Sequence, residues 1–256
     1  MKYGICNLST IPLYEASDNA SELISQVLFG EHYKVLQENK KWLKIKLNYD
    51  NCEGWIDAKQ HIEISKEYFD LLAKTDRIVS NEFIDFIEDE QHNLFPIILG
   101  SRLPFYTKNS FEIKNKKLSF NGRISGNKSS KKSIINAAFT YLNAPFLRGG
   151  KTPFGIDSSG FTQMVYMLNG YHLLRSASQQ ATQGEVLSFI EESDPGDLAF
   201  FDDNEGQIIH VGIILANHHI IHASGKVRID RLDHSGIYNA DLNKHTHKLR
   251  VIKKIF

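Results

Sequence analysis

This sequence of 256 residues has only two cysteines, no formal net charge and no long apolar run. Its two cysteines, Cys6 and Cys52, could form at most one disulfide, which excludes a disulfide-built secreted scaffold. The 30 Lys and Arg residues balance the 30 Asp and Glu residues, so no overall field exists to hold nucleic acid or an anionic bilayer. No apolar run approaches the length of a membrane span, and the N-terminus lacks the apolar stretch of a signal peptide. These absences predict a cytoplasmic protein whose partners include neither nucleic acid nor a membrane.

The sequence does contain enough apolar material for real cores, because 41% of its residues are hydrophobic and 23% are charged. Its length allows one large domain or two to three small ones. Residues 1–65 hold short apolar runs broken by turn residues, with a period of two at residues 42–47, which is typical of a small β-barrel. Residues 66–128 begin with a helix-like segment and continue as a second, less regular β module. The polar stretch at residues 114–132 suits a linker or an exposed hairpin.

Residues 129–256 differ from the rest because helical patterns come first and strands follow. Ser133 is available as the N-cap of a helix that runs to about Asn143. A second helical pattern over residues 161–168 ends at Asn169 and the glycine after it, as a helix C-terminus should. Strand-like apolar runs lie at residues 197–201, 208–215, 219–223 and 249–252. This order of elements predicts an α+β domain.

The segment GIDSSGF at residues 155–161 stands where a loop enters the second helix. Its small residues let the backbone approach a ligand, and Asp157 or Ser158 can cap the helix. A nucleophile in the first turn would feel the positive end of the helix dipole, which lowers the pKa of a thiol there. Simple helix capping is the alternative interpretation of the same residues.

Two histidines occupy mirrored positions in neighbouring strand-like runs. His210 and His222 are symmetric about a turn centred on Ala216, so their imidazoles can face each other within about a residue of register. The pair predicts a general base and a residue that orients it, although a single such histidine is typical of a satisfied core residue. A zinc site is the rival hypothesis, but it needs a third ligand. The other histidines considered, none at a recognised spacing, are His218, His219, His234, His245 and His247. We therefore predict no metal site.

Four motifs, in this order, resemble the NlpC-type papain-like cysteine peptidases. They are FLRGGKTPFGIDSSGFTQ at residues 146–163, DPGDLAFF at 194–201, IHVGI at 209–213 and IHA at 221–223. The β modules upstream resemble bacterial SH3 domains, so the whole architecture is similar to the dipeptidyl-peptidase VI group. The resemblance implies a papain-like domain of helices packed on an antiparallel sheet over residues 129–256, preceded by two small SH3-like β-barrels over residues 1–65 and 66–128.

The function implied by the resemblance is that of a thiol protease in murein recycling. Such a hydrolase cleaves the bond between γ-D-Glu and a diamino acid in peptides that carry a free N-terminal L-Ala, and it needs no cofactor. By position, Ser158 is the nucleophile, His210 the base and His222 the residue that orients the base. The family has cysteine where this chain has Ser158, and a helix terminus and a histidine do not ionise a hydroxyl as they ionise a thiol. The other departures from the family pattern are Arg148, Cys52 and Ser176, where the family has Trp, Tyr and Asp.

The resemblance also implies residues that bind the substrate. Asp157 and Glu22 would receive the free amino group of L-Ala in a charge-assisted contact, with a solvated surface carboxylate as the alternative for Glu22. Ser159 and Ser178 match positions that hydrogen-bond the dipeptide, although serines in such loops also cap the backbone. Two arginines after the second histidine would pair with a substrate carboxylate or remain solvated strand-edge charges: Arg228 and Arg231.

The departures leave three interpretations of Ser158 open: natural loss or change of activity, an engineered replacement of cysteine, and a working serine variant. Two other classes of protein also stay open. A muropeptide-binding protein would bind the substrate without turnover. An adaptor that acts through its SH3-like modules would bind proteins and leaves His210 and His222 unexplained. The sequence does not define the diamino acid or the oligomeric state.

Overall fold

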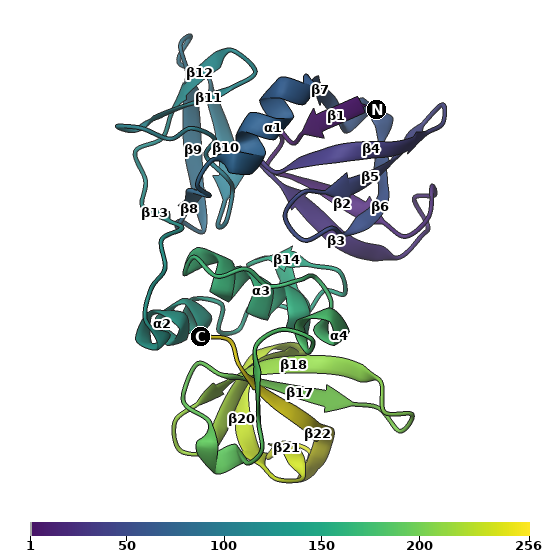
Figure 1. Ribbon diagram of the computed structural model, residues 1–256, viewed down its shortest axis with the longest axis vertical. Coiled ribbons are helices and arrows are strands. Elements are labelled where there is room, and N and C mark those ends of the chain that lie inside the picture. Colours follow the sequence, from purple (N-terminus) through teal and green to yellow (C-terminus); the bar gives the residue numbers. More distant parts are fainter. Residues whose placement is uncertain (1) are drawn as a thin grey trace. The chain divides into compact units, whose positions relative to one another are not determined.

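The chain forms two compact units, Met1–Asn127 and Lys128–Phe256, in a computed structural model that describes residues 2–256 (Figure 1). Antiparallel sheets make up most of the first unit, and the second unit combines helices with antiparallel strands. The predicted α+β class is therefore confirmed. Among residues 2–256, no helix is both long and apolar enough to cross a membrane.

A seven-stranded antiparallel sheet begins the first unit, with its strands in the order β3-β2-β6-β5-β4-β1-β7. The strands are β1 (Lys2–Ile5), β2 (Thr10–Tyr14), β3 (Leu23–Leu28), β4 (His32–Glu38), β5 (Trp42–Leu47), β6 (Glu53–Asp57) and β7 (Ile62–Ile64), with the short 3-10 helix η1 (Ala58–Gln60) before β7. The predicted alternation at residues 42–47 is strand β5, whose Leu43, Ile45 and Leu47 are buried while the residues between them are half-exposed. These three side chains join an apolar cluster with others from β2, β3, β4 and β6.

A helix and a four-stranded antiparallel sheet, in the order β10-β9-β12-β11, form the rest of the first unit. The elements are α1 (Lys66–Lys74), β8 (Val79–Ser80), β9 (Ile84–Asp89), β10 (Leu94–Ile98), β11 (Ser110–Ile113), β12 (Lys116–Ser119) and β13 (Ile124–Ser125). Helix α1 buries Phe69 and Leu72 in a cluster to which both sheets contribute, including Ile5 on β1 and Ile87 on β9. The predicted boundary at residue 65 stays a prediction, since the two sheets share this cluster.

The polar stretch predicted as a linker or hairpin contains a tight turn between β11 and β12. Lys114 and Asn115 both have positive φ, 47° and 64°, as a two-residue hairpin turn requires. The same stretch continues through β12 and β13 into the second unit.

The first helix of the second unit, α2 (Lys131–Thr140), begins earlier than predicted. Ser130 is its N-cap, with extended backbone (φ −74°, ψ 163°), so the predicted cap at Ser133 is wrong. Two lysines, which are good helix formers, lengthen the first turn ahead of Ser133. The helix also ends before the predicted Asn143, whose φ of 68° is left-handed.

The second predicted helix is confirmed as α3 (Ser158–Leu168), and all its residues are buried. It ends at Asn169, followed by Gly170 with a φ of 75°. The short strands β14 (Lys151–Thr152) and β15 (Gly155–Ile156) precede it, and the short helix α4 (Ala177–Gln180) follows it.

Six antiparallel strands close into a barrel in the order β22-β17-β18-β19-β20-β21, because β21 pairs back to β22. The strands of this region are β16 (Glu185–Leu187), β17 (Leu198–Asp202), β18 (Ile208–Leu215), β19 (His219–Ser224), β20 (Lys226–Asp233), β21 (Gly236–Asn239) and β22 (Lys244–Lys254), with the 3-10 helix η2 (Ile190–Glu192) after β16. Strand β22 begins at Lys244 rather than at the predicted residue 249, so it reaches both β17 and β21. Because β20 and β21 were not predicted either, the closure of the sheet was not expected.

Helix α3 packs against strands β18 and β19 of this barrel. Figure 1 displays α3 running alongside β18 within the second unit. The fold therefore brings the helix that begins at Ser158 against the two strands that carry His210 and His222.

Candidate active site

The start of α3 is built around the carboxylate of Asp157, which is the N-cap of the helix. Its Oδ1 accepts hydrogen bonds from the backbone N–H of Gly160 (2.6 Å) and from Ser159 Oγ (3.2 Å), and its Oδ2 accepts one from the N–H of Gly149 (2.9 Å). Ser158 is the first residue of the helix and is 7% exposed. The predicted capping by Asp157 is confirmed, and Ser158 lies at the positive end of the helix dipole.

A close approach of two backbone segments fixes the position of this helix start. A Cβ on Gly160 would lie 2.3 Å from the carbonyl oxygen of Gly150, which real side chains do not allow. Glycine at position 160 therefore lets the loop before β14 pack directly on the first turn of α3.

Arg175 was not singled out from the sequence, yet it holds Asp157. Its Nη1 and Nη2 donate to Asp157 Oδ1 (3.0 Å) and Oδ2 (2.7 Å), and Nη1 also lies 3.0 Å from Ser159 Oγ. Arg175 is 5% exposed, so this bidentate pair is shielded from water. A substrate ammonium that bound Asp157 would share the carboxylate with this guanidinium.

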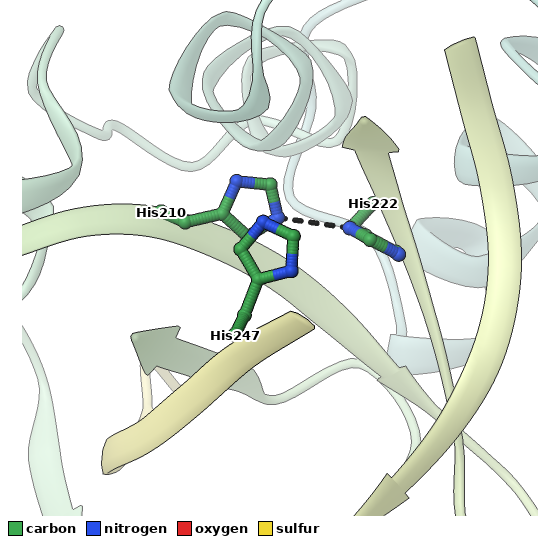
Figure 2. Close-up of side chains that lie close together, drawn as sticks. All are labelled: His210, His222 and His247. Atoms are coloured by element: carbon green, nitrogen blue, oxygen red, sulfur yellow. Dashed lines mark hydrogen bonds between the residues drawn. The ribbon is translucent and has the colours of Figure 1, made fainter. Parts of the chain in front are cut away.

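The two histidines meet as predicted, with a different register (Figure 2). His210 on β18 and His222 on β19 are both buried, and His210 Nε2 lies 2.8 Å from His222 Nδ1. His222 stands opposite Gly212 rather than opposite His210, so the turn is centred one residue later than predicted. Because side chains alternate with a period of two, the diagonal pair still shares one face of the sheet.

Asp230 on β20 extends this pair into a chain of three groups. Its Oδ2 lies 3.0 Å from His222 Nε2 and accepts from Arg228 Nε (2.7 Å), while its Oδ1 accepts from Arg228 Nη2 (2.9 Å). Burial by itself would raise the pKa of Asp230, but the hydrogen bonds from His222 and Arg228 outweigh it and hold the pKa below its ordinary value. The carboxylate is therefore ionised and can only accept.

The ionised carboxylate fixes the protons on both imidazoles. Burial lowers the pKa of His210 well below its ordinary value and also lowers that of His222, so both rings are neutral at neutral pH. His222 then donates from Nε2 to Asp230, which leaves its Nδ1 as an acceptor for the Nε2–H of His210. The remaining nitrogen, His210 Nδ1, keeps a lone pair and can act as a base.

A third imidazole, that of His247 on β22, packs on His210 (Figure 2). The two ring centroids are 4.1 Å apart with an interplanar angle of 29°. Burial lowers the pKa of His247 to about 4. Each of the three histidines offers a ligand nitrogen, and these nitrogens lie within 4.8 Å of one another. His247 was not predicted as a partner because the last strand was expected only at residues 249–252. The alternation of exposed Lys248 and Arg250 was the available signal.

The two predicted dipeptide-binding serines lie in different environments. Ser159 belongs to the Asp157 and Arg175 network, whereas Ser178 on α4 is exposed and its Oγ lies 3.1 Å from Ser176 Oγ. Ser176, where the family has Asp, caps α4. Their contacts with substrate stay predictions.

The first unit holds two of the residues named from the sequence. Glu22 precedes β3 with an exposed side chain, and Cys52 precedes β6 with a half-buried side chain. Arg148, in the second unit, is exposed. The role of Glu22 at the site stays a prediction.

The two arginines that follow the second histidine, Arg228 and Arg231, lie in different environments. Arg228 is not a solvated strand-edge charge, because it pairs with Asp230 and with Asp241 Oδ2 at 2.8 Å. Its contact with a substrate carboxylate stays a prediction. Arg231 is exposed.

The second unit is a barrel domain in which His210 and His222 are buried and in contact and α3 packs on the strands that carry them. Comparison with known proteins identifies its family. Residues 143–247 match the NlpC/P60 family, and residues 13–60 match the bacterial dipeptidyl-peptidase Sh3 domain. The C-terminal unit therefore belongs to the NlpC/P60 family of peptidoglycan peptidases and is preceded by a bacterial dipeptidyl-peptidase SH3 domain. The resemblance inferred from the motifs is confirmed.

Individual relatives agree with this assignment. The chain is 26% identical over 216 residues to a gamma-D-glutamyl-L-lysine dipeptidyl-peptidase of Bacillus subtilis, covering 78% of this chain and 71% of the relative. It is 24% identical over 260 residues to dipeptidyl-peptidase 6 of Lysinibacillus sphaericus, covering 90% and 92%. The crystal structure of an NlpC/P60 family protein from Bacillus cereus shares the fold, with a TM-score of 0.82 at 18% identity over 99% of both chains.

Proposed function

We propose that the second unit takes murein peptides of the form L-Ala-γ-D-Glu-diamino acid and acts on the bond between γ-D-Glu and the diamino acid. The observation that carries this proposal is the chain from Asp230 through His222 to His210, which leaves a lone pair on His210 Nδ1. The named activities of the relatives support the substrate class. Cytoplasmic recycling of murein fragments is part of the same proposal.

The reaction would use Ser158 in the nucleophile position. His210 Nδ1 would take the Oγ proton as Oγ attacks the γ-glutamyl carbonyl, and backbone N–H groups at the start of α3 would stabilise the oxyanion. The protonated His210 would give its proton to the leaving amine, and water would then release L-Ala-γ-D-Glu from the acyl-enzyme. The carboxylate of Asp230 stabilises the positive charge on the imidazoles during the transfer.

The side chain at position 158 would limit the rate of peptide hydrolysis. A thiol next to a helix N-terminus and a histidine ionises near neutral pH, whereas a hydroxyl must lose its proton in the transition state itself. We therefore expect slow turnover by the chain and much faster turnover by Ser158→Cys. The second candidate function, binding without turnover, is favoured by the same hydroxyl.

Recognition of the substrate amine is proposed for Glu22 and Asp157. Because Arg175 already pairs with Asp157 through both carboxylate oxygens, that carboxylate by itself offers an ammonium little uncompensated charge.

The proposal is tested with synthetic L-Ala-γ-D-Glu-diaminopimelate and its N-acetylated form, using the full chain. Calorimetry measures binding and mass spectrometry measures release of the dipeptide. We expect the free peptide to bind at least about ten-fold more tightly than the acetylated one, since a charge-assisted contact is lost. Binding without dipeptide release supports the second candidate function, a protein that binds the peptide without turnover. No binding and no cleavage of either peptide contradicts the proposed substrate class.

A further inference from the structure

Three imidazoles from three different strands converge at one point of the barrel wall (Figure 2). They belong to His210 on β18, His222 on β19 and His247 on β22, and their ligand nitrogens lie within 4.8 Å of one another. Only the first two have a part in the peptidase chemistry described above, so the third needs another account.

The surroundings of His222 match those of a metal ligand. Histidines that bind metals almost always donate their second ring N–H to a carboxylate or carbonyl, which fixes the tautomer. His222 does this with Asp230 at 3.0 Å, so its Nδ1 points at His210 with a lone pair. Arg228 holds Asp230 in place through both carboxylate oxygens.

We propose that His210, His222 and His247 form a site for a divalent transition-metal ion of the zinc type. Three imidazole nitrogens suit zinc, copper or nickel rather than magnesium or calcium, which prefer oxygen ligands. Zinc bonds of about 2.0–2.1 Å in a tetrahedron put two ligand nitrogens about 3.4 Å apart. His210 Nε2 and His222 Nδ1 lie 2.8 Å apart and all three ligand nitrogens lie within 4.8 Å of one another, so modest ring rotations bring all three onto one ion.

Metal binding and the peptidase base exclude each other at this site. A metal on His210 Nε2 replaces the N–H that His210 donates to His222, so the proton moves to Nδ1 and removes the base. The inference stands independently of the proposed peptidase activity, since binding is measured without any peptide.

A second group of histidines provides the matched control. His218, His234 and His245 line a cavity of about 720 Å³ elsewhere in the barrel domain. His234 and His245 are exposed and lie 3.3 Å from Glu191 and 2.8 Å from Asp233. Adventitious binding to surface histidines would depend on these residues instead.

The test titrates the untagged, chelator-treated full chain with Co²⁺ by visible absorption and with Zn²⁺ by calorimetry. We expect one equivalent of Zn²⁺ with a Kd on the order of 1 µM or below. His247→Phe keeps a ring stacked on His210 but has no ligand atom, and it should weaken binding at least about ten-fold, as should His222→Gln. The double variant His234→Gln/His245→Gln should bind as the parent chain does.

Circular dichroism checks that each variant is folded, and His247→Gln replaces His247→Phe where the larger ring disturbs packing. Full-strength binding by a folded His247 variant, or no binding by the folded parent chain, overturns the proposal. Loss of binding confined to the His234 and His245 double variant overturns it as well, because the ion would then sit on the exposed histidines.

Discussion

At the scale of single residues, one carboxylate determines which ring nitrogens of the two histidines carry a proton. Asp230 is ionised and faces His222, so the tautomers of His222 and His210 follow from it. The sequence could predict the histidine pair because strands have a period of two and a turn lay between them. It could not predict Asp230, because the partner of a side chain depends on which strand lies alongside, and β20 was not foreseen.

Replacement of Asp230 tests this proton arrangement. In the Ser158→Cys chain, Asp230→Asn should lower kcat/KM by about 10²-fold or more, because an amide can donate to His222 and favour the wrong tautomer. Asp241→Asn is the matched control, since Asp241 also pairs with Arg228 but is 75% exposed and does not touch His222. Steady-state hydrolysis measures both, and equal rates for the two variants would contradict the role of Asp230.

At the scale of elements, α3 and the β18–β19 hairpin were predicted well because their signals are local. The Asp157 cap, the Asn169 end and the apolar face of α3 all lie within its own segment. Arg175 and His247 were not predicted because their partners are distant in the sequence: Arg175 lies in the loop before α4 and His247 near the start of β22. Long-range strand pairing also explains why the closure of the barrel was not expected.

Gly160→Ala tests the close approach at the start of α3. Helix propensity alone would make alanine at this position more stable by about 1 kcal/mol. The Cβ would lie 2.3 Å from the Gly150 carbonyl oxygen, so we expect a loss of about 2 kcal/mol or more in the free energy of unfolding instead. Denaturant unfolding measures the sign of the change in the free energy of unfolding. A variant more stable than the parent chain would rule out the close packing of Gly160 on Gly150.

Arg102 joins helix α1 to strand β4 in the first unit. It contacts His32, whose titration should make the stability of that unit depend on pH. Its Nη2 donates to the carbonyl of Leu72 (2.6 Å) and its Nη1 lies 3.0 Å from His32 Nδ1. Burial, followed by the charges of Arg102 and Arg77, lowers the pKa of His32 to about 2. The unfolded chain binds a proton on this histidine near pH 6.5, whereas the folded chain does not.

The stabilising contribution of neutral His32 is therefore complete above pH 6.5 and is lost as the pH falls from there towards 2. The loss from this group is at most about 1.4 kcal/mol per pH unit. His32→Gln keeps an acceptor for Arg102 but cannot titrate, so its free energy of unfolding should fall less steeply between pH 7 and 5. Parallel pH profiles for the variant and the parent chain would show that His32 is not the group responsible.

At the scale of the whole molecule, the substrate proposal assigns a task to each unit. It assigns the base to His210 in the second unit, and the resemblance implies that Glu22 in the first unit accepts the substrate amine. The family could be predicted from the sequence because its motifs are contiguous. The spatial relation of residues that belong to different units is not encoded in any such local pattern.

Glu22→Gln tests the assignment to the first unit. In the Ser158→Cys chain, we expect kcat/KM for the free peptide to fall about ten-fold, with no change for the N-acetylated peptide, because only the free amine is charged. Glu205→Gln, which removes an exposed carboxylate from the turn after β17, is the control. An equal effect of Glu22→Gln on both peptides would assign Glu22 a structural role only.

The proposed function requires that His210 acts as a base and that residue 158 limits the reaction. The most direct measurement is dipeptide release from L-Ala-γ-D-Glu-diaminopimelate by three chains: the parent, Ser158→Cys, and Ser158→Cys with His210→Gln. We expect at least about 10²-fold faster release by Ser158→Cys than by the parent, and return to the parent rate or below when His210 is also replaced. No release by a folded Ser158→Cys chain would contradict the claim.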